Sequence, residues 1–269
     1  MLQKEKKLIV IGDPIEDIYA TVQDGKTLDT CTLPGGASNT YHNAKTILFE
    51  TELFSKVHFV PQLEFTKKYL YKILRLNNQS DIHLCKSVDK EDYYSDIQYT
   101  TQRQLNLSLD KADYESVLIF SDYNKGTLNI RIHKYEGVDK VKLAIVDSKY
   151  SSLHSSLFDF ADTYIWRCTS NEYNSDFAKN FDYVIWTDGP NPIKILDKKQ
   201  KIIASFSIPD VQIVDTCGAG DTFTAALAVY LFKNSSLKIK NIEKAILFSI
   251  DASLNVIQKA KTAITDIKI

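Results

Sequence analysis

The chain has 269 residues, of which 44% are hydrophobic and 25% are charged, and its formal net charge is −1 at pH 7. This composition supplies enough apolar side chains for a sizeable core and argues against a disordered protein. The balanced charge gives no sign of nucleic acid or an anionic membrane as the main partner. The apolar run 222–232 is far too short to span a bilayer, and the charged N-terminus lacks a following signal-type apolar region. We therefore expect a cytoplasmic protein with no membrane partner.

Short apolar runs alternate along the chain with segments of helical periodicity. We predict strands at 7–12, 51–54, 57–60, 82–85, 94–101, 117–120, 141–146, 163–166 and 183–186, and a hairpin of 193–196 with 202–206. Helices are predicted at 34–49, 62–76, 127–135, 219–232 and 240–258.

This alternation predicts an α/β fold with a mostly parallel sheet and helices on both faces. Glycines and polar residues follow the strand ends, which is where such sheets bind ligands. The sequence contains no repeat, low-complexity segment or linker, so a single domain over 1–269 is the simplest interpretation. Residues 19–33 and 94–104 are expected to add a small β extension.

The four cysteines, Cys31, Cys85, Cys168 and Cys217, are scattered and form no CxxC pair. This spacing suggests neither a zinc site nor a disulfide framework, so free thiols are expected. Cys217 as a nucleophile is the less favoured alternative, because no histidine lies close to it in the sequence.

The most informative stretch is Val214-Asp-Thr-Cys-Gly-Ala-Gly-Asp-Thr-Phe223, directly before an apolar helical run. A Gly-Ala-Gly turn at a helix start leaves backbone N–H groups uncovered and directed at an anion. Asp221 beside such a site would take a proton from a group attacking the anion, as phosphoryl transfer requires. Gly218, Ala219 and Gly220 would then form the anion hole. The alternative is an ordinary glycine loop that caps a buried helix.

Two further glycine-containing segments suggest a substrate side. Pro34-Gly-Gly-Ala-Ser-Asn39 would let a ligand lie against bare backbone, with Asn39 bonding a hydroxyl; alternatively it is a turn with Ser38 as the helix N-cap. In Gly12-Asp-Pro-Ile-Glu-Asp17, carboxylates after a strand could accept hydrogen bonds from sugar hydroxyls. The alternative there is a solvated loop. No segment fits the GxxxxGK[ST] phosphate loop.

Two charged residues extend the hypothesis. Lys125, in Ser121-Asp-Tyr-Asn-Lys-Gly126, could meet a phosphate or lie in a surface turn. Glu172 could organise Mg²⁺ and water near nucleotide phosphates, or it could be the macrodipole partner of a helix start.

These motifs together resemble the ribokinase-like, or PfkB, carbohydrate kinase family over residues 8–262. Asp215–Asp221 is similar to its C-terminal signature, Gly35, Gly36 and Asn39 to its Gly-Gly…Asn element, and Gly12 with Asp17 to its first-strand element. When the segments 121–126 and Asp147-Ser-Lys149 are considered together with these motifs, the chain looks most like the heptose 7-phosphate kinase domains. The resemblance implies ATP- and Mg²⁺-dependent phosphorylation of a sugar hydroxyl, here the anomeric hydroxyl of a phosphorylated heptose.

The resemblance also implies roles for single residues. Asp221 would be the base, with Gly218, Ala219 and Gly220 as the anion hole. The sugar side would be Asp13, Asp17, Gly35, Gly36, Asn39 and Lys125. The nucleotide side would be Lys149, Glu172, Thr187, Gly189 and Thr216, with Glu172 reaching the metal through water.

The sequence departs from the family pattern in three places. Thr169 stands where the Asn of Asn-x-x-Glu is expected, and Lys261 stands where a glycine is usual. The short stretch between Asp17 and Gly35 implies a reduced lid, the part of the fold that often carries dimerisation in this family, so a homodimer is an open prediction.

A cytosolic sugar kinase is thus the favoured function. One alternative is a catalytically weak or inactive regulatory protein that binds a sugar phosphate on the same fold. Another keeps the chemistry but changes the acceptor to a nucleoside, ribose or a fructose phosphate.

Overall fold

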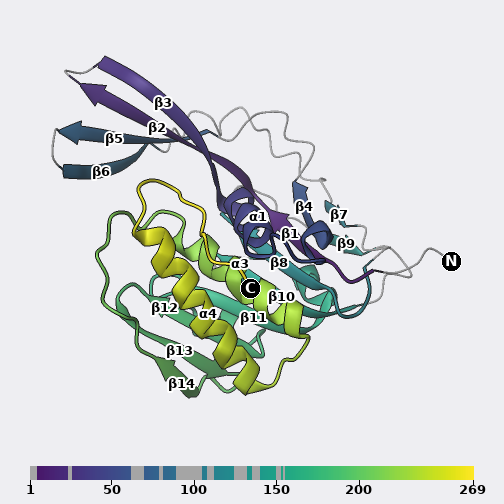
Figure 1. Ribbon diagram of the computed structural model, residues 1–269. Helices are drawn as coiled ribbons and strands as arrows, with labels where there is room; N and C mark the ends of the chain where they lie inside the picture. The colour runs from purple at the N-terminus through teal and green to yellow at the C-terminus, as the bar shows by residue number, and fades with distance from the viewer. Residues whose placement is uncertain are drawn as a thin grey trace.

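A computed structural model describes residues 5–23, 26–61, 70–78, 81–88, 105–107, 112–123, 132–134, 140–149, 153 and 155–269. Its main sheet has eight strands in the order β14-β13-β12-β11-β10-β8-β1-β4 (Figure 1). The strands are β1 (Leu8–Gly12), β4 (Val57–Pro61), β8 (Val117–Asp122), β10 (Val141–Ser148), β11 (Ala161–Thr169), β12 (Tyr183–Asp188), β13 (Asn191–Asp197) and β14 (Ile202–Phe206).

The six strands from β4 to β12 are parallel, and β13 and β14 add an antiparallel edge. Every residue of β1 and β8 is buried, as continuous apolar runs predict for a parallel sheet covered on both faces. The α/β class and the mostly parallel sheet are therefore confirmed.

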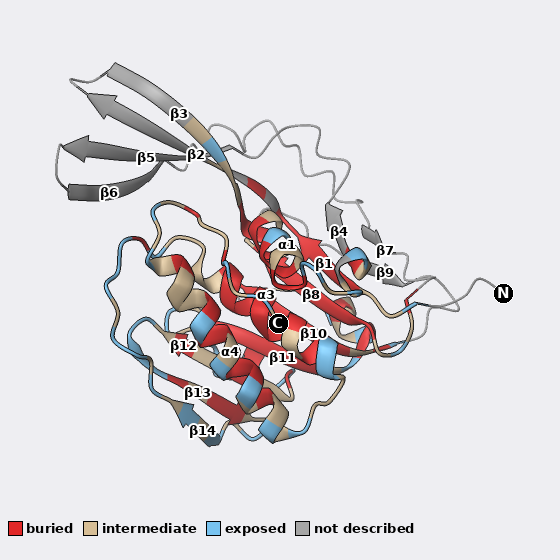
Figure 2. Cartoon of the chain, viewed as in Figure 1, coloured by how far each residue is buried: buried red, intermediate tan, exposed pale blue. Residues whose placement is uncertain are grey.

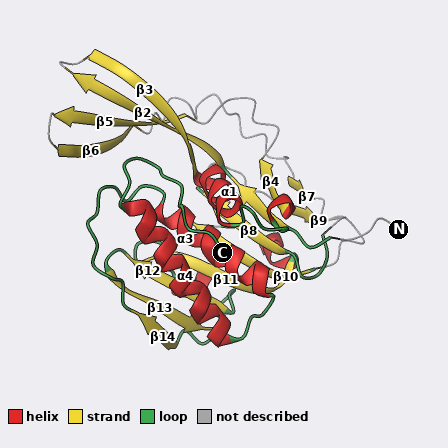
Figure 3. Cartoon of the chain, in the orientation of Figure 1, coloured by secondary structure: helices red, strands yellow, loops and turns green. Residues whose placement is uncertain are grey.

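Three helices cover one face of this sheet, namely α1 (Gly36–Ile47), α3 (Ala219–Asn234) and α4 (Ile239–Ile257) (Figure 3). They share a hydrophobic core with the strands, which includes Val10, Ile119 and Ile145. Helix α3 is buried over most of its length (Figure 2), because its sequence is apolar on nearly all sides. This central helix carries the predicted anion turn at its N-terminus.

The opposite face packs around an aromatic cluster that includes Trp166, Phe120, Phe160 and Phe181. Within the described residues, its helical cover consists of the short α2 (Ser175–Ala178) and the 3₁₀ turn η3 (Ser155–Asp159). The long helices predicted for this chain thus lie on one face of the described structure.

Three local predictions were wrong. Residues 70–76 belong to a strand, because pairing with two neighbouring strands outweighs a helical spacing that short apolar runs share; residues 62–69 lie outside the described part. Residues 132–134 form β9 (Ile132–Lys134), paired with β7 (Leu105–Leu107), and the rest of the predicted helix 127–135 is not described. Residues 51–53 form a turn and Phe54 begins η1 (Phe54–Lys56), and the Thr51 hydroxyl donates to the Leu48 carbonyl at 2.7 Å.

A second, small sheet has the order β3-β2-β5-β6 and projects from the main body (Figure 1). Its strands are β2 (Pro14–Gln23), β3 (Lys26–Gly35), β5 (Leu70–Asn78) and β6 (Asp81–Val88). The β extension expected at 19–33 is present, and its described partners come from 70–88; residues 94–104 lie outside the described part. The strands β2 and β3 have ten residues each, and a reduction of this sheet relative to the family's lid stays a prediction.

The chain reverses its direction of travel across the main sheet at β1. It passes from β1 to β4 on one side and later returns to β8 on the other, so the carboxyl ends of β1 and β8 form a topological switch point. A Cβ on Gly12 would lie 2.0 Å from the Ser121 carbonyl oxygen. Only glycine therefore allows the two strands to end so close together, and ligands of such sheets bind at this position.

Candidate active site

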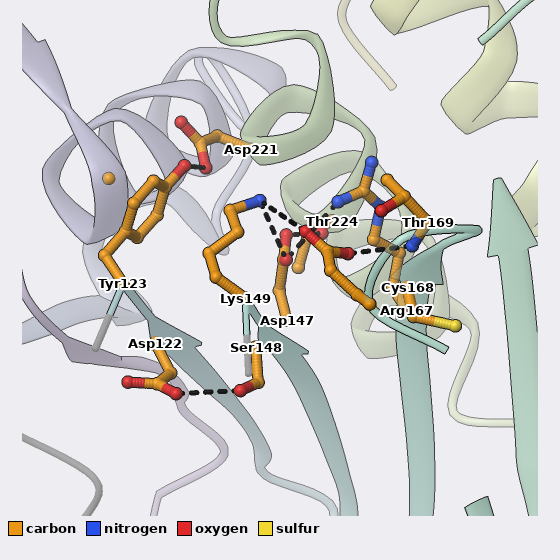
Figure 4. Close-up of polar contacts among 12 residues, drawn as sticks. Asp122, Tyr123, Asp147, Ser148, Lys149, Arg167, Cys168, Thr169, Asp221 and Thr224 are labelled. Carbon is orange, nitrogen blue, oxygen red and sulfur yellow. Dashed lines mark hydrogen bonds and ion pairs between the residues drawn. The ribbon is translucent and has the colours of Figure 1, made fainter. Parts of the chain in front are cut away.

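Asp221 lies on the first turn of α3 and is buried, with 4% of its surface exposed. Both of its carboxylate oxygens accept hydrogen bonds. The Asn39 amide donates to Oδ2 at 3.1 Å, and the Tyr123 hydroxyl donates to Oδ1 at 2.5 Å. Helix α1, the residue after strand β8 and helix α3 thus meet at one carboxylate, and Figure 4 shows its contact with Tyr123.

Burial raises the pKa of Asp221 to about 6, although the Lys149 ammonium opposes the shift. A carboxyl whose pKa lies near neutral pH can accept a proton in one step and release it in the next. Desolvation and the partial positive charge at the helix start act in opposite directions on the carboxylate. The site therefore has the properties of a general base.

The anion turn begins at Gly218, the N-cap of α3, whose φ is +80°. A left-handed residue at this point turns the chain sharply into the helix, so that first-turn N–H groups face the same side. The Ala219 N–H donates to the Thr216 carbonyl at 3.3 Å, which closes the turn. Gly218, Ala219 and Gly220 thus lead directly to the candidate base at the start of α3, and their role as an anion hole stays a prediction.

Replacing Gly218 with Ala is expected to affect both stability and catalysis. The new Cβ would lie 2.7 Å from Asn39 Nδ2, in a backbone conformation that costs a side chain about 1–2 kcal/mol. Displacing the amide removes one donor from Asp221, so we expect at least a tenfold loss of turnover in addition to a lower melting temperature.

A matched control for stability is Gly189→Ala, because Gly189 also has a positive φ (+55°) but a Cβ there would meet nothing within 4 Å. Comparing the two melting temperatures separates backbone strain from the clash. Equal destabilisation by both variants would contradict the assigned contact between Gly218 and Asn39.

An ion network lies below the base, at the carboxyl ends of β10 and β11. Asp147 Oδ1 lies 3.6 Å from Lys149 Nζ and 3.4 Å from Arg167 Nη1, and Asp147 Oδ2 accepts the Thr224 hydroxyl at 2.7 Å. Lys149 also pairs with Glu172 at 3.5 Å. Figure 4 shows the Lys149 ammonium between Asp221 and Asp147.

Charge pairing decides the protonation of this network. Burial opposes the charge on Asp147, but Lys149 and Arg167 outweigh it and lower the pKa of the carboxyl. Burial likewise opposes the charges on Lys149 and Arg167, and Asp147 outweighs it and raises both pKa values. Two cations thus stay charged next to the anion turn, where a phosphoryl group would need them.

Glu172 lies in the turn after β11 and not at a helix start. Its Oε2 accepts the Thr169 N–H at 2.8 Å, whereas α2 begins later, with Asn174 as its N-cap. The macrodipole interpretation of Glu172 is therefore wrong.

The described residues contain no group of three or more His, Cys, Asp or Glu side chains that could hold a metal ion. Mg²⁺ commonly uses one or two carboxylates together with substrate phosphates and water. Glu172 fits such a site as a single carboxylate, whereas a metal cage made of protein alone does not fit the described residues.

The substrate-side residues gather at the switch point. Asp13 is buried and its Oδ2 accepts the Tyr123 N–H at 2.9 Å, so the solvated-loop interpretation is wrong for it. Asp17 accepts the Thr262 hydroxyl at 2.5 Å and lies against Gly35. The N-cap of α1 is Gly35, which excludes the alternative in which Ser38 is the cap. Gly36 opens α1, and Lys125 lies outside the described residues.

The nucleotide-side residues are spread over neighbouring strand ends. Thr187, at the end of β12, donates to the Cys168 carbonyl at 3.1 Å, and Gly189 follows in the turn toward β13. Thr216 is exposed before the anion turn. Of these residues, Lys149 also acts on Asp221, because its positive charge lowers the pKa of that carboxyl.

Lys261 has a left-handed backbone conformation, with a φ of +69°, which is the region that favours glycine. Its N–H donates to Asp215 Oδ2 at 2.7 Å, and Asp215 Oδ1 accepts the Cys217 N–H at 3.0 Å. The Lys261 ammonium lies 2.9 Å from Cys31 Sγ. The turn at 261 therefore joins the anion loop to the small sheet.

Cys31, Cys168 and Cys217 are free thiols, as expected, and the side chain of Cys85 lies outside the described part. Burial raises the pKa of the Cys168 thiol, which makes it inert.

Sequence reasoning gave no role to three residues of the site, namely Tyr123, Asp147 and Arg167. Arg167 was detectable as a charged residue inside the apolar strand 161–169, because an ion is rarely buried in a strand without a partner. Tyr123 and Asp147 show no such local signal.

Comparison with known structures identifies the fold. The fold is ribokinase-like. Arabidopsis thaliana ribokinase, in complex with ribose and ATP, superposes with a TM-score of 0.59 and 18% identity over 97% of this chain and 94% of its own. Escherichia coli phosphofructokinase-2, in complex with potassium, superposes with a TM-score of 0.58 and 15% identity, over 97% of this chain and 96% of its own. A Methanocaldococcus jannaschii nucleoside kinase superposes with a TM-score of 0.57 and 14% identity, over 99% of this chain and 96% of its own.

At the level of sequence, residues 174–268 match the family model for pfkB family carbohydrate kinases, a span that includes the anion turn. No curated protein sequence matches the chain. None of the helices that the structure describes combines the length and hydropathy needed to cross a membrane.

Proposed function

We propose that this chain is an ATP-dependent carbohydrate kinase in which Asp221 is the general base. The observation that carries the proposal is a buried carboxyl with a pKa of about 6 on the first turn of a helix that begins with a glycine anion turn. The ribokinase-like fold and the carbohydrate kinase family match over 174–268 support it.

In this mechanism the acceptor hydroxyl binds beside Asp221 and attacks the γ-phosphorus of ATP. A P–O bond forms to the acceptor, the bond to ADP breaks, and the hydroxyl proton passes to Asp221. The N–H groups of Gly218 and Gly220 and the Lys149 ammonium stabilise the charge that develops on the phosphoryl oxygens, and the Ala219 N–H holds the turn through the Thr216 carbonyl. Mg²⁺, held by the phosphates and by Glu172 through water, would neutralise further charge.

The acceptor that we propose is a heptose that already carries a phosphate, and its anomeric hydroxyl receives the phosphoryl group from ATP. The support is motif similarity in 121–126 and 147–149, of which Tyr123 and Lys149 lie beside Asp221. The similar structures are of a ribokinase, a phosphofructokinase and a nucleoside kinase. Ribose, a fructose phosphate and nucleosides are therefore the alternative acceptors.

A second candidate function is a regulatory protein that binds a sugar phosphate with little or no catalysis. It is favoured by two contacts of Glu172, with the Lys149 ammonium and with the Thr169 N–H, because they leave less of the carboxylate for metal-bound water. The cytoplasmic location and a homodimer formed through the small sheet stay predictions, and size-exclusion chromatography tests the latter.

An ADP-release assay over a panel of sugars, sugar phosphates and nucleosides tests the function. We expect one acceptor to stimulate ADP release in wild type but not in the Asp221→Asn variant. Binding of a sugar phosphate, measured as a rise in melting temperature, without ADP release under any condition would favour the regulatory protein.

The pH dependence of kcat/KM follows from the same carboxyl. Asp221 must be ionised to accept a proton, and its pKa is about 6. We therefore expect kcat/KM to fall about tenfold per pH unit below roughly pH 6 and to level off above it. Initial rates between pH 5 and pH 8 measure this limb; a limb near the ordinary carboxyl pKa of about 4 would show that the base is solvated.

A further inference from the structure

The Asp221 carboxylate is held by one donor on each oxygen, from opposite sides of the site. Asn39 comes from α1 and Tyr123 follows β8, so the two donors belong to elements that meet only at the switch point. A carboxylate oxygen has two acceptor positions. Each Asp221 oxygen therefore keeps one acceptor position for a further donor. The hydrogen bonds from Asn39 and Tyr123 fix the plane of the carboxylate.

The Asn39 donor is oriented by a chain of amides. The Thr265 N–H donates to Asn43 Oδ1 at 3.0 Å, and Asn43 Nδ2 donates to Asn39 Oδ1 at 2.9 Å. Because Asn39 Oδ1 is an acceptor in this chain, its NH₂ group must be the end that faces Asp221. The amide side of the carboxylate is thus set by residues away from the catalytic surface.

The Tyr123 donor is fixed by its backbone and its ring. Its N–H donates to Asp13 Oδ2 at 2.9 Å, and Lys149 Nζ lies 4.9 Å from the ring centroid. Burial, and next the neighbouring Asp221 charge, hold the pKa of the phenol well above its ordinary value. The hydroxyl therefore keeps its proton throughout the neutral pH range and acts only as a donor to the base.

We propose that Tyr123 is a positioning residue for phosphoryl transfer, whose phenol, together with the Asn39 amide, orients the Asp221 carboxylate toward the acceptor alcohol and keeps it ionised. This inference rests on the proposed kinase function and adds a residue to it. Tyr123 acts through Asp221 and transfers no proton itself.

The charges around Asp221 give the direction of the expected effect. Lys149, Tyr123 and Asn39 favour its ionised form, whereas burial and Asp147 disfavour it, and Arg167 is a further nearby cation. Removing the phenol hydroxyl deletes a charge-assisted hydrogen bond and leaves the other groups in place. The pKa of Asp221 must then rise, by about one unit for one such bond.

The test is the Tyr123→Phe variant, which keeps the ring over Lys149 and removes only the hydroxyl. Carboxyl ¹³C NMR titration of the full chain measures the pKa of Asp221 directly, with Asp221→Asn identifying the resonance. We expect this pKa to rise by about one unit in Tyr123→Phe, the acid limb of kcat/KM to move upward equally, and kcat to fall about tenfold at neutral pH with little change in KM.

Tyr164→Phe is the matched control, because the Tyr164 hydroxyl also makes buried hydrogen bonds, but to backbone groups of 157–161. We expect it to lower the melting temperature without moving the Asp221 titration. An unchanged Asp221 pKa in Tyr123→Phe would overturn the proposal. So would a lower KM with undiminished kcat, because the phenol would then be a competitor of the acceptor. A raised pKa without phosphoryl transfer to any acceptor would refute the kinase function and leave the positioning contact intact.

Discussion

Asp221→Asn is expected to lower kcat by about 10²–10⁴-fold, the range that general base catalysis contributes. Asparagine keeps the size of the side chain and its contact with the Tyr123 hydroxyl, but it cannot accept a proton at neutral pH. The KM for the sugar should change little, because the lost interaction is made in the transition state. Steady-state kinetics with the best acceptor measures both constants.

The matched control for this variant is Asp251→Asn, an acidic residue exposed on α4, which should behave as wild type. A raised KM with unchanged kcat in Asp221→Asn would assign Asp221 to sugar binding and remove the general base from the mechanism.

The second large effect is expected on stability. Asp147→Ala removes the carboxylate that pairs with Lys149 and Arg167 and accepts the Thr224 hydroxyl. Arg167 is then left as a buried cation without this partner, which typically costs about 3–5 kcal/mol. For a chain of this size the melting temperature should fall by roughly 10 °C. Thermal unfolding followed by circular dichroism gives the shift.

Asp176→Ala provides the comparison, because the Asp176–Lys179 pair is shorter, at 2.7 Å, but lies at the surface, with 85% of the Asp176 side chain exposed. Exposed pairs contribute about 0–1 kcal/mol. If both variants lowered the melting temperature equally, the network at the ends of β10 and β11 would not be held by ionic pairing.

The sequence was sufficient for the parts of the fold whose signals are local. The strands β1 and β8 are mainly apolar runs, and α3 follows a glycine turn and is apolar on nearly all sides, so each can be predicted from its own sequence. The hydrogen bond between Asn39 and Asp221 was not predicted, because the sequence placed Asn39 only on the sugar side. The structure supplies the reason for this contact, because both residues lie at the switch point.

The remainder depends on contacts between distant segments. Tyr123 and Asp221 are 98 positions apart in the sequence, and Asp147 and Thr224 are 77 positions apart, yet each pair is hydrogen-bonded. No local periodicity carries such information. The strand at 70–78 was mistaken for a helix for the same reason, since its conformation is decided by β2 and β6 and not by its own apolar spacing.

The turn at 261–265 has a consequence for the order in which the protein becomes competent during translation. Thr262 reaches Asp17 across 245 positions, and Thr265 reaches Asn43 across 222. A nascent chain on the ribosome can build the sheet and α1 long before these residues emerge. Until Thr265 emerges, Asn43 lacks the N–H that holds its side chain, and the chain that orients the Asn39 amide toward Asp221 is incomplete. Proteolytic cleavage between α4 and Thr262 would return a finished molecule to the same incomplete condition.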